Sequence, residues 1–152
     1  MDRKWFEKLH ALSVGPTTIE EILALLNERP DDVELYQLLG NLYFRRGELQ
    51  EAWQAFMRAL ELSPNDPFTC LYFGNLLTVC KDKKPAKELY EHAVRVAPAL
   101  PVAHSAKADF HRSQRRWDLA NDEYEKAVAV DPTDAQAQAK LAEWKSYMMD
   151  GT

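Results

Sequence analysis

Apolar side chains between Val33 and Asp66 recur with the period of an α-helix. Four positions follow the i, i+3, i+4, i+7 spacing of one helical face, namely Tyr36, Leu39, Gly40 and Tyr43. Gly47 interrupts this pattern, and a second apolar face follows, made by Ala52, Phe56, Ala59 and Leu60. The segment therefore predicts two antiparallel helices, which can approach closely because Gly40 and Ala52 are small.

A single helix pair of this kind cannot bury its apolar face alone, so it needs a neighbour. The same pattern recurs twice more, each time after 34 residues. The positions of Gly40, Ala52, Phe56, Ala59 and Pro64 are taken in the second copy by Gly74, Ala86, Tyr90, Ala93 and Pro98, and in the third by Ala108, Ala120, Tyr124, Ala127 and Pro132. Matching residue types at a fixed spacing indicate an internal repeat.

This repeat resembles the tetratricopeptide repeat family, whose pattern at this period is W-x2-L-G-x2-Y, then A-x3-F, then P. The first copy carries it as Tyr36, Leu39, Gly40, Tyr43, Ala52, Phe56 and Pro64. The resemblance extends from Val33 to about Asp134. It implies an all-α fold, a right-handed superhelical solenoid of antiparallel helix pairs with a concave groove.

The repeat and the helix signals together predict where the elements lie. We expect helices at 32–46, 48–61, 66–80, 84–96, 101–113 and 117–129, and a capping helix at 135–149. We expect one tetratricopeptide repeat domain over 1–152, with repeats at 33–66, 67–100 and 101–134. Residues 1–30 are either a degenerate repeat that continues the stack or a separate helical lead. Within them, Thr17 or Thr18 caps a helix whose apolar stripe is Ile19, Ile22, Leu23 and Leu26.

The third copy departs from the family pattern in its first helix. His104, Lys107 and His111 occupy positions where the family prefers apolar residues. One interpretation is a polar patch that responds to pH, because histidine titrates near neutrality. The other, which we favour, is a looser repeat in which the Lys107 stem lies along apolar surface and Phe110 fills the core.

Composition narrows the class of protein. The chain has 152 residues, is 46% hydrophobic and carries a net charge of −5, as expected for one soluble domain. No apolar run reaches the roughly 18 residues of a membrane span, and the charged N-terminus is not a signal peptide, so we expect a cytoplasmic protein. Cys70 and Cys80 are roughly 15 Å apart on one predicted helix, too far for a disulfide.

No motif in the sequence predicts catalysis. Phosphate-binding glycine loops, dinucleotide fingerprints, zinc-protease helices and CxxC pairs are all missing. The histidines do not have metal-ligand spacing, since His104 and His111 are two helical turns apart. We therefore expect a non-enzyme that needs no cofactor or metal.

The family resemblance implies that the groove is lined by the first helix of each repeat, at its second, fifth, ninth and twelfth positions. The candidate peptide-binding residues are Gln37, Asn41, Phe44, Phe68, Leu71, Asn75, Val102, Asp109 and Arg112. Phe44, Phe68, Leu71 and Val102 would form an apolar centre, and the two asparagines could hydrogen-bond a peptide backbone. The alternative is that Phe68 and Leu71 pack against neighbouring helices.

Co-chaperones of this family hold a C-terminal carboxylate with lysine, asparagine and arginine side chains of the groove. Gln37 and Val102 stand where two of those lysines are expected. Without these charges the carboxylate clamp is weakened. We therefore predict that the acidic chaperone tail does not bind strongly.

Two further surfaces are candidates for interaction. Basic residues gather at the turns within the repeats, at Arg45, Arg46, Lys83, Lys84, Arg115 and Arg116. They could recruit an acidic protein or only complement helix dipoles, and the net negative charge argues against nucleic acid. Near the N-terminus, Trp5, Phe6, Leu9 and Leu12 are more apolar than one buried face needs, which suggests a homodimer.

The most favoured function is a protein–protein interaction module that binds an extended or helical peptide segment in its groove. One alternative is a secretion or assembly chaperone, because the layout of a helical lead, three repeats and a closing helix is similar to chaperones of the translocator class. A second alternative is a structural subunit whose N-terminal helices join copies of the chain.

Overall fold

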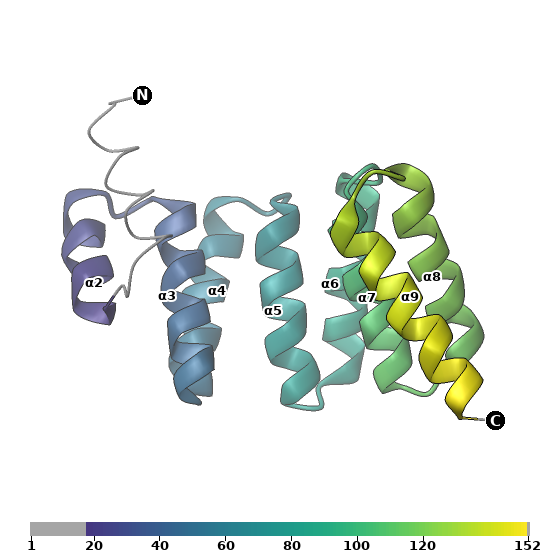
Figure 1. Ribbon diagram of the computed structural model, residues 1–152. Helices are drawn as coiled ribbons and strands as arrows, with labels where there is room; N and C mark the ends of the chain where they lie inside the picture. The colour runs from purple at the N-terminus through teal and green to yellow at the C-terminus, as the bar shows by residue number, and fades with distance from the viewer. Residues whose placement is uncertain (1–17, 152) are drawn as a thin grey trace. The chain divides into compact units, whose positions relative to one another are not determined.

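The computed structural model describes residues 18–151, and within them every regular element is a helix (Figure 1). The helices are α2 (Ile19–Glu28), α3 (Val33–Arg46), α4 (Leu49–Leu62), α5 (Pro67–Val79), α6 (Lys83–Val96), α7 (Pro101–Ser113), α8 (Trp117–Val130) and α9 (Ala135–Asp150). The all-α prediction is confirmed. The bounds predicted from α3 to α9 agree with those observed to within about one residue, the normal uncertainty of helix ends.

The chain divides into two compact units, Met1–Leu62 and Ser63–Thr152. In the first unit α3 packs against α4, and α2 packs against α3. In the second unit α5 pairs with α6 and α7 pairs with α8, while α9 contacts both α7 and α8. One continuous domain stays a prediction, as does a stack continued by residues 1–30. Most of that segment, including Trp5, Phe6, Leu9 and Leu12, lies outside the described residues.

Local signals explain where α2 begins and which face it buries. The Thr18 hydroxyl accepts a hydrogen bond from the Glu21 backbone N–H at 3.2 Å, and the Glu21 carboxylate accepts one from the Thr18 N–H at 3.0 Å. This capping box satisfies two N–H groups at the helix start. Ile22 is fully buried in the core of the first unit, but Leu23 is 44% exposed. The predicted apolar stripe was therefore wrong at Leu23.

Two helix pairs are built on close contact between a glycine and an aromatic ring. A Cβ atom added to Gly40 would lie 2.5 Å from Cε1 of Phe56, whose ring is fully buried. A Cβ atom on Gly74 would lie 2.9 Å from Cζ of Tyr90. No ordinary Cβ contact is this short, so glycine is required for the helices to approach as they do. Ala108 takes this place in the third pair.

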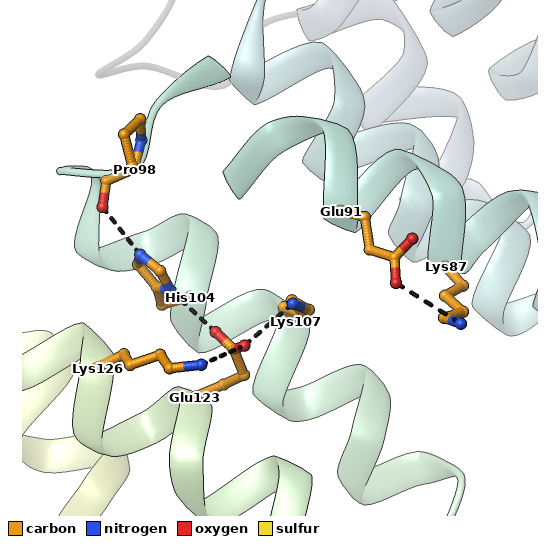
Figure 2. A network of polar contacts seen from close by, with 7 residues as sticks. All are labelled: Lys87, Glu91, Pro98, His104, Lys107, Glu123 and Lys126. Carbon is orange, nitrogen blue, oxygen red and sulfur yellow. Dashed lines mark hydrogen bonds and ion pairs between the residues drawn. The ribbon is translucent and has the colours of Figure 1, made fainter. Parts of the chain in front are cut away.

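The seam between α7 and α8 contains a buried polar network (Figure 2). Glu123 of α8 is buried, although leucine stands one repeat earlier, at Leu89. Its carboxylate lies 2.9 Å from Nδ1 of His104 and 3.0 Å from Nζ of Lys107. Nζ of Lys126, also on α8, lies 3.2 Å from the same carboxylate. The sequence did not predict this pairing of Lys107 with a buried carboxylate, whereas Phe110 fills the core as predicted, with 4% of its surface exposed.

His104 contacts groups on both sides of its ring. Its Nε2 atom lies 2.9 Å from the backbone carbonyl oxygen of Pro98, and its Nδ1 atom faces the Glu123 carboxylate. His104 thus ties the turn before α7 to α8.

Charge complementarity outweighs the cost of burial at Glu123. Burial alone would raise the pKa of this carboxyl, but hydrogen bonds from His104 and Lys107, with the Lys107 charge, lower its pKa from 4.5 to about 2. His111 is different, because its buried Nδ1 has no hydrogen-bond partner. Burial and the nearby charge of Lys107 lower the pKa of His111, so this ring is neutral at pH 7.

The glycine contact predicts a specific stability loss. Gly40→Ala should destabilise the protein by about 1 to 2 kcal/mol, because the overpacking cost exceeds the gain in helix propensity. Urea unfolding followed by circular dichroism measures the change. In a cycle with Phe56→Leu, which makes room, the penalty of Gly40→Ala should shrink. A Gly40→Ala protein as stable as wild type would contradict the close contact.

The buried network predicts a pH-dependent stability. Because the folded pKa of Glu123 is depressed, its contribution is complete above pH 4.5 and is lost as pH falls toward 2. A shift of this size corresponds to about 3 kcal/mol at pH 7. Glu123→Gln should remove it and leave a smaller acid dependence. Glu125→Gln, at an exposed site on the same helix, is the matched control. Equal acid dependence of wild type and Glu123→Gln would rule out the contribution.

Candidate functional site

A pocket of about 150 Å³ lies in the second unit, where α5, α7 and α9 meet. Its lining residues are Asn75, Val102, Ser105, Ala106, Asp109, Asp134, Gln136, Ala137 and Lys140. Three of the nine predicted site residues, Asn75, Val102 and Asp109, are thus brought together. We call this site the α5–α7–α9 pocket.

Repeat register explains why Asn75 and Asp109 lie near each other. They are 34 residues apart and take the same position on α5 and α7, the first helices of successive pairs. These two helices contact each other directly. Equivalent positions on neighbouring first helices therefore open onto the same pocket.

The side chain of Asn75 is oriented by Tyr90, whose ring packs on Gly74. The Tyr90 hydroxyl donates a hydrogen bond to Asn75 Oδ1 at 2.6 Å. Tyr90 is buried, and burial raises the pKa of its phenol to about 12, so the hydroxyl keeps its proton at neutral pH. Because Oδ1 is engaged, the Nδ2 amino group is the end of the amide that can donate to a ligand.

Asp109 is held in the equivalent way. The Tyr124 hydroxyl donates to Oδ1 of Asp109, and Lys140 of α9 donates to Oδ2. Burial, followed by the hydrogen bond to Asp109 and its charge, raises the pKa of the Tyr124 phenol well above its ordinary value. The first pair has Phe56 at this position, which has no hydroxyl to offer Asn41.

The pocket combines a small apolar surface with hydrogen-bond donors. Val102, Ala106 and Ala137 supply the apolar part. The Asp134 carboxylate is already used to cap α9, accepting from the Ala137 N–H at 2.7 Å. Donors come from the Asn75 and Gln136 amides, the Ser105 hydroxyl and the Lys140 ammonium. This arrangement suits a carbonyl-bearing segment with a small apolar side chain.

The other predicted site residues have varied surroundings. On α3 of the first unit, Gln37, Asn41 and Phe44 are all half-buried. On α5, Phe68 is 42% exposed, whereas Leu71 is only 4% exposed and is part of the core. Arg112 of α7 points toward α9, with its Nη1 atom 3.7 Å from Oε1 of Glu143. For Leu71, this burial agrees with the packing alternative.

Residues from α9 were missed by sequence reasoning. Lys140 was not among the predicted site residues, yet it is half-buried and bonded to Asp109. The signal that could have found them is the 34-residue interval. Extended once more, it makes Gln136 equivalent to Val102 and Lys140 equivalent to Ala106.

Neither a metal site nor a membrane span is found in residues 18–151. No group of three or more histidine, cysteine, aspartate or glutamate side chains there could hold a metal ion. None of the helices in that part of the chain combines the length and the apolar character that crossing a bilayer requires.

Comparison with curated proteins finds relatives that are much longer than this chain. A DnaJ homolog subfamily C member 7 homolog of Dictyostelium discoideum is 26% identical over 150 residues, which are 93% of this chain and 28% of the relative. Its counterpart from Schizosaccharomyces pombe is 24% identical over 67% of this chain and 22% of the relative. Anaphase-promoting complex subunit 3 of the same yeast is 29% identical over 68% of this chain and 16% of its own length. The chain thus spans under a third of each.

Solved structures share the fold at low identity. A thermophilic tetratricopeptide repeat protein of Thermus thermophilus aligns with a TM-score of 0.75 and 22% identity, covering 83% of this chain and 70% of that one. The first such domain of Spaghetti (RPAP3), bound to the HSP90 peptide SRMEEVD, aligns with a TM-score of 0.64 and 18% identity, covering 77% and 93%. Residues 33–66 match the tetratricopeptide repeat family model. Residues 33–66 therefore carry a tetratricopeptide repeat, and the described residues share the fold of tetratricopeptide repeat proteins.

Proposed function

We propose that the second unit binds a peptide segment of a partner protein in the α5–α7–α9 pocket. The fold is one that serves as a protein–protein interaction module. The observation that carries the finer proposal is the Tyr90 hydrogen bond, which turns the Asn75 amino group toward a ligand. A donor fixed in advance loses little conformational entropy when it binds a peptide carbonyl.

The size and polarity of the pocket define the ligand. A space of about 150 Å³ takes a single side chain rather than a folded surface. Val102 and Ala137 would contact an apolar side chain, while the Asn75 amide donates to the adjacent backbone carbonyl. We infer a non-catalytic role, since the pocket holds no nucleophile paired with a general base.

The chaperone alternative has one observation in its favour. Two relatives are DnaJ homologs, and one similar structure holds an HSP90 peptide. Lysine is nevertheless replaced in this chain by Gln37 and Val102, so a carboxylate clamp lacks two charges. The structural-subunit alternative and the cytoplasmic location stay predictions, and the proposed dimer surface lies outside the described residues.

A double-mutant cycle tests the proposed site. Peptides that bind the wild-type protein are first selected from a displayed random library. Their affinities for Asn75→Ala, Tyr90→Phe and the double variant are then measured by calorimetry. Each single variant should weaken binding by about three- to tenfold, the range for one hydrogen bond. The double variant should lose little more, because both changes remove one arrangement. Phenylalanine is accommodated at the equivalent position, Phe56, so the ring packing survives.

A matched control lies on the outside of α6. Glu88→Gln, at an exposed site on α6, should leave affinity unchanged. If the selected peptides bind Asn75→Ala as tightly as wild type, or if the losses at Asn75 and Tyr90 simply add, the proposed site is wrong.

Because Gln37 and Val102 stand where lysines are expected, we predict weak binding of an acidic peptide tail. The peptide SRMEEVD should bind at least about tenfold more weakly than the selected peptides, because a carboxylate needs charged donors to bind tightly. The Gln37→Lys, Val102→Lys variant should bind it more tightly, and more so at low salt. Comparable affinity of wild type for SRMEEVD and the selected peptides would instead favour the chaperone alternative.

A further inference from the structure

A second hollow, separate from the α5–α7–α9 pocket, lies where the last turn of α9 meets the start of α8. Its volume is about 370 Å³, and it is lined by Trp117, Tyr147, Met148, Asp150 and Gly151. Nothing in the proposed peptide site uses these residues. Because Tyr147 and Met148 are 53% and 40% exposed, the hollow opens directly to solvent.

Aromatic rings form the rigid part of the hollow. The ring centroids of Trp117 and Tyr147 are 6.0 Å apart, with their planes inclined by 52°. Trp144 packs within 5.9 Å of Trp117 and stacks on Tyr147 at 5.8 Å. Trp144 is buried, and its Nε1–H donates to Asn121 of α8 at 3.1 Å. This anchored tryptophan fixes the two rings that line the hollow.

The charge around the hollow favours a cation. Asp150 is the ionised side chain that lines it. This carboxylate sits at the C-terminal end of α9, where the helix dipole already places negative charge and makes an acidic residue unfavourable. A cation near Tyr147 would therefore meet negative charge from both the carboxylate and the helix end.

From this geometry we propose that the hollow binds the methylated ammonium group of a lysine side chain in a partner protein. Aromatic faces attract cations through their quadrupoles, and such cages suit alkylated ammonium groups. Aromatic and thioether walls cannot replace the hydrogen bonds that water makes to an unmethylated ammonium, which has three donors. Methyl groups remove that requirement while the charge remains to pair with Asp150.

The test uses short peptides that differ only at the cation. The probe is an acetylated, amidated Gly-Lys-Gly peptide with trimethyl-lysine, unmethylated lysine, or a neutral analogue in which carbon replaces the ammonium nitrogen. Binding to the full chain is followed through the Trp117 indole N–H signal in NMR spectra. The trimethylated peptide should bind saturably, at least about fivefold more tightly than the other two.

Matched variants locate the site. Asp150→Asn should weaken binding of the trimethylated peptide by about tenfold without loss of helicity, because removing a negative charge at a helix C-terminus does not destabilise the helix. Tyr147→Leu should weaken it similarly, whereas Trp53→Phe in the first unit should have no effect.

Several results would overturn the proposal. The first is that the neutral analogue or the unmethylated peptide binds as tightly as the trimethylated one. The second is that Asp150→Asn binds the trimethylated peptide with unchanged affinity. The third is that the Trp117 signal shows no saturable shift up to about 20 mM peptide, which is about tenfold above a dissociation constant of about 2 mM. Tighter binding of phosphocholine than of the trimethylated peptide would overturn the assignment to a protein side chain. The peptide site at Asn75 is untouched by any of these outcomes.

Discussion

Each helix pair depends on one aromatic ring of its second helix, packed against a small residue of its first. Phe56 meets Gly40 and Tyr90 meets Gly74 at distances that exclude a Cβ atom. The ring sets how closely the helices approach and is buried in both pairs. When the ring is a tyrosine, its hydroxyl also reaches the polar residue next to the glycine, as at Asn75. One side chain thus fixes both the packing of the pair and the orientation of a surface amide.

The third pair meets the same requirement with a different seam. Tyr124 still packs near Ala108, but the neighbouring positions hold His104, Lys107 and Glu123 instead of apolar residues. Replacing a whole buried ion network by apolar residues is often neutral or stabilising, whereas removing one partner alone is strongly destabilising. The stability that the pairing gives Glu123 is therefore measured against a protonated or unpaired carboxyl, not against an apolar seam. Its partners have to be present together, because an unpaired Glu123 would be a buried charge.

Periodicity and repeat spacing were enough to predict the helices, since each depends on local patterns such as the Gly40 and Phe56 positions. The site was predicted less completely. Asn75, Val102 and Asp109 came from the family resemblance, which implies groove positions on the first helix of each repeat, but Lys140 did not, because α9 was predicted only as a capping helix. The pairing of Lys107 with Glu123 was missed for a related reason. The family pattern marks Lys107 only as a departure from an apolar position. The change that compensates it, Glu123, lies 16 residues away on another helix.

The proposed peptide site follows from this packing of the repeats. Repeat symmetry brings equivalent positions of α5 and α7 to one pocket, and a buried tyrosine turns the Asn75 amide so that it donates outward. The most direct measurement is chemical-shift mapping of the Asn75 side-chain amide during titration with a selected peptide. The account predicts that the Nδ2 protons shift saturably, together with the methyl groups of Val102. Shifts confined to other surfaces, with the Asn75 amide unmoved at saturation, would contradict it.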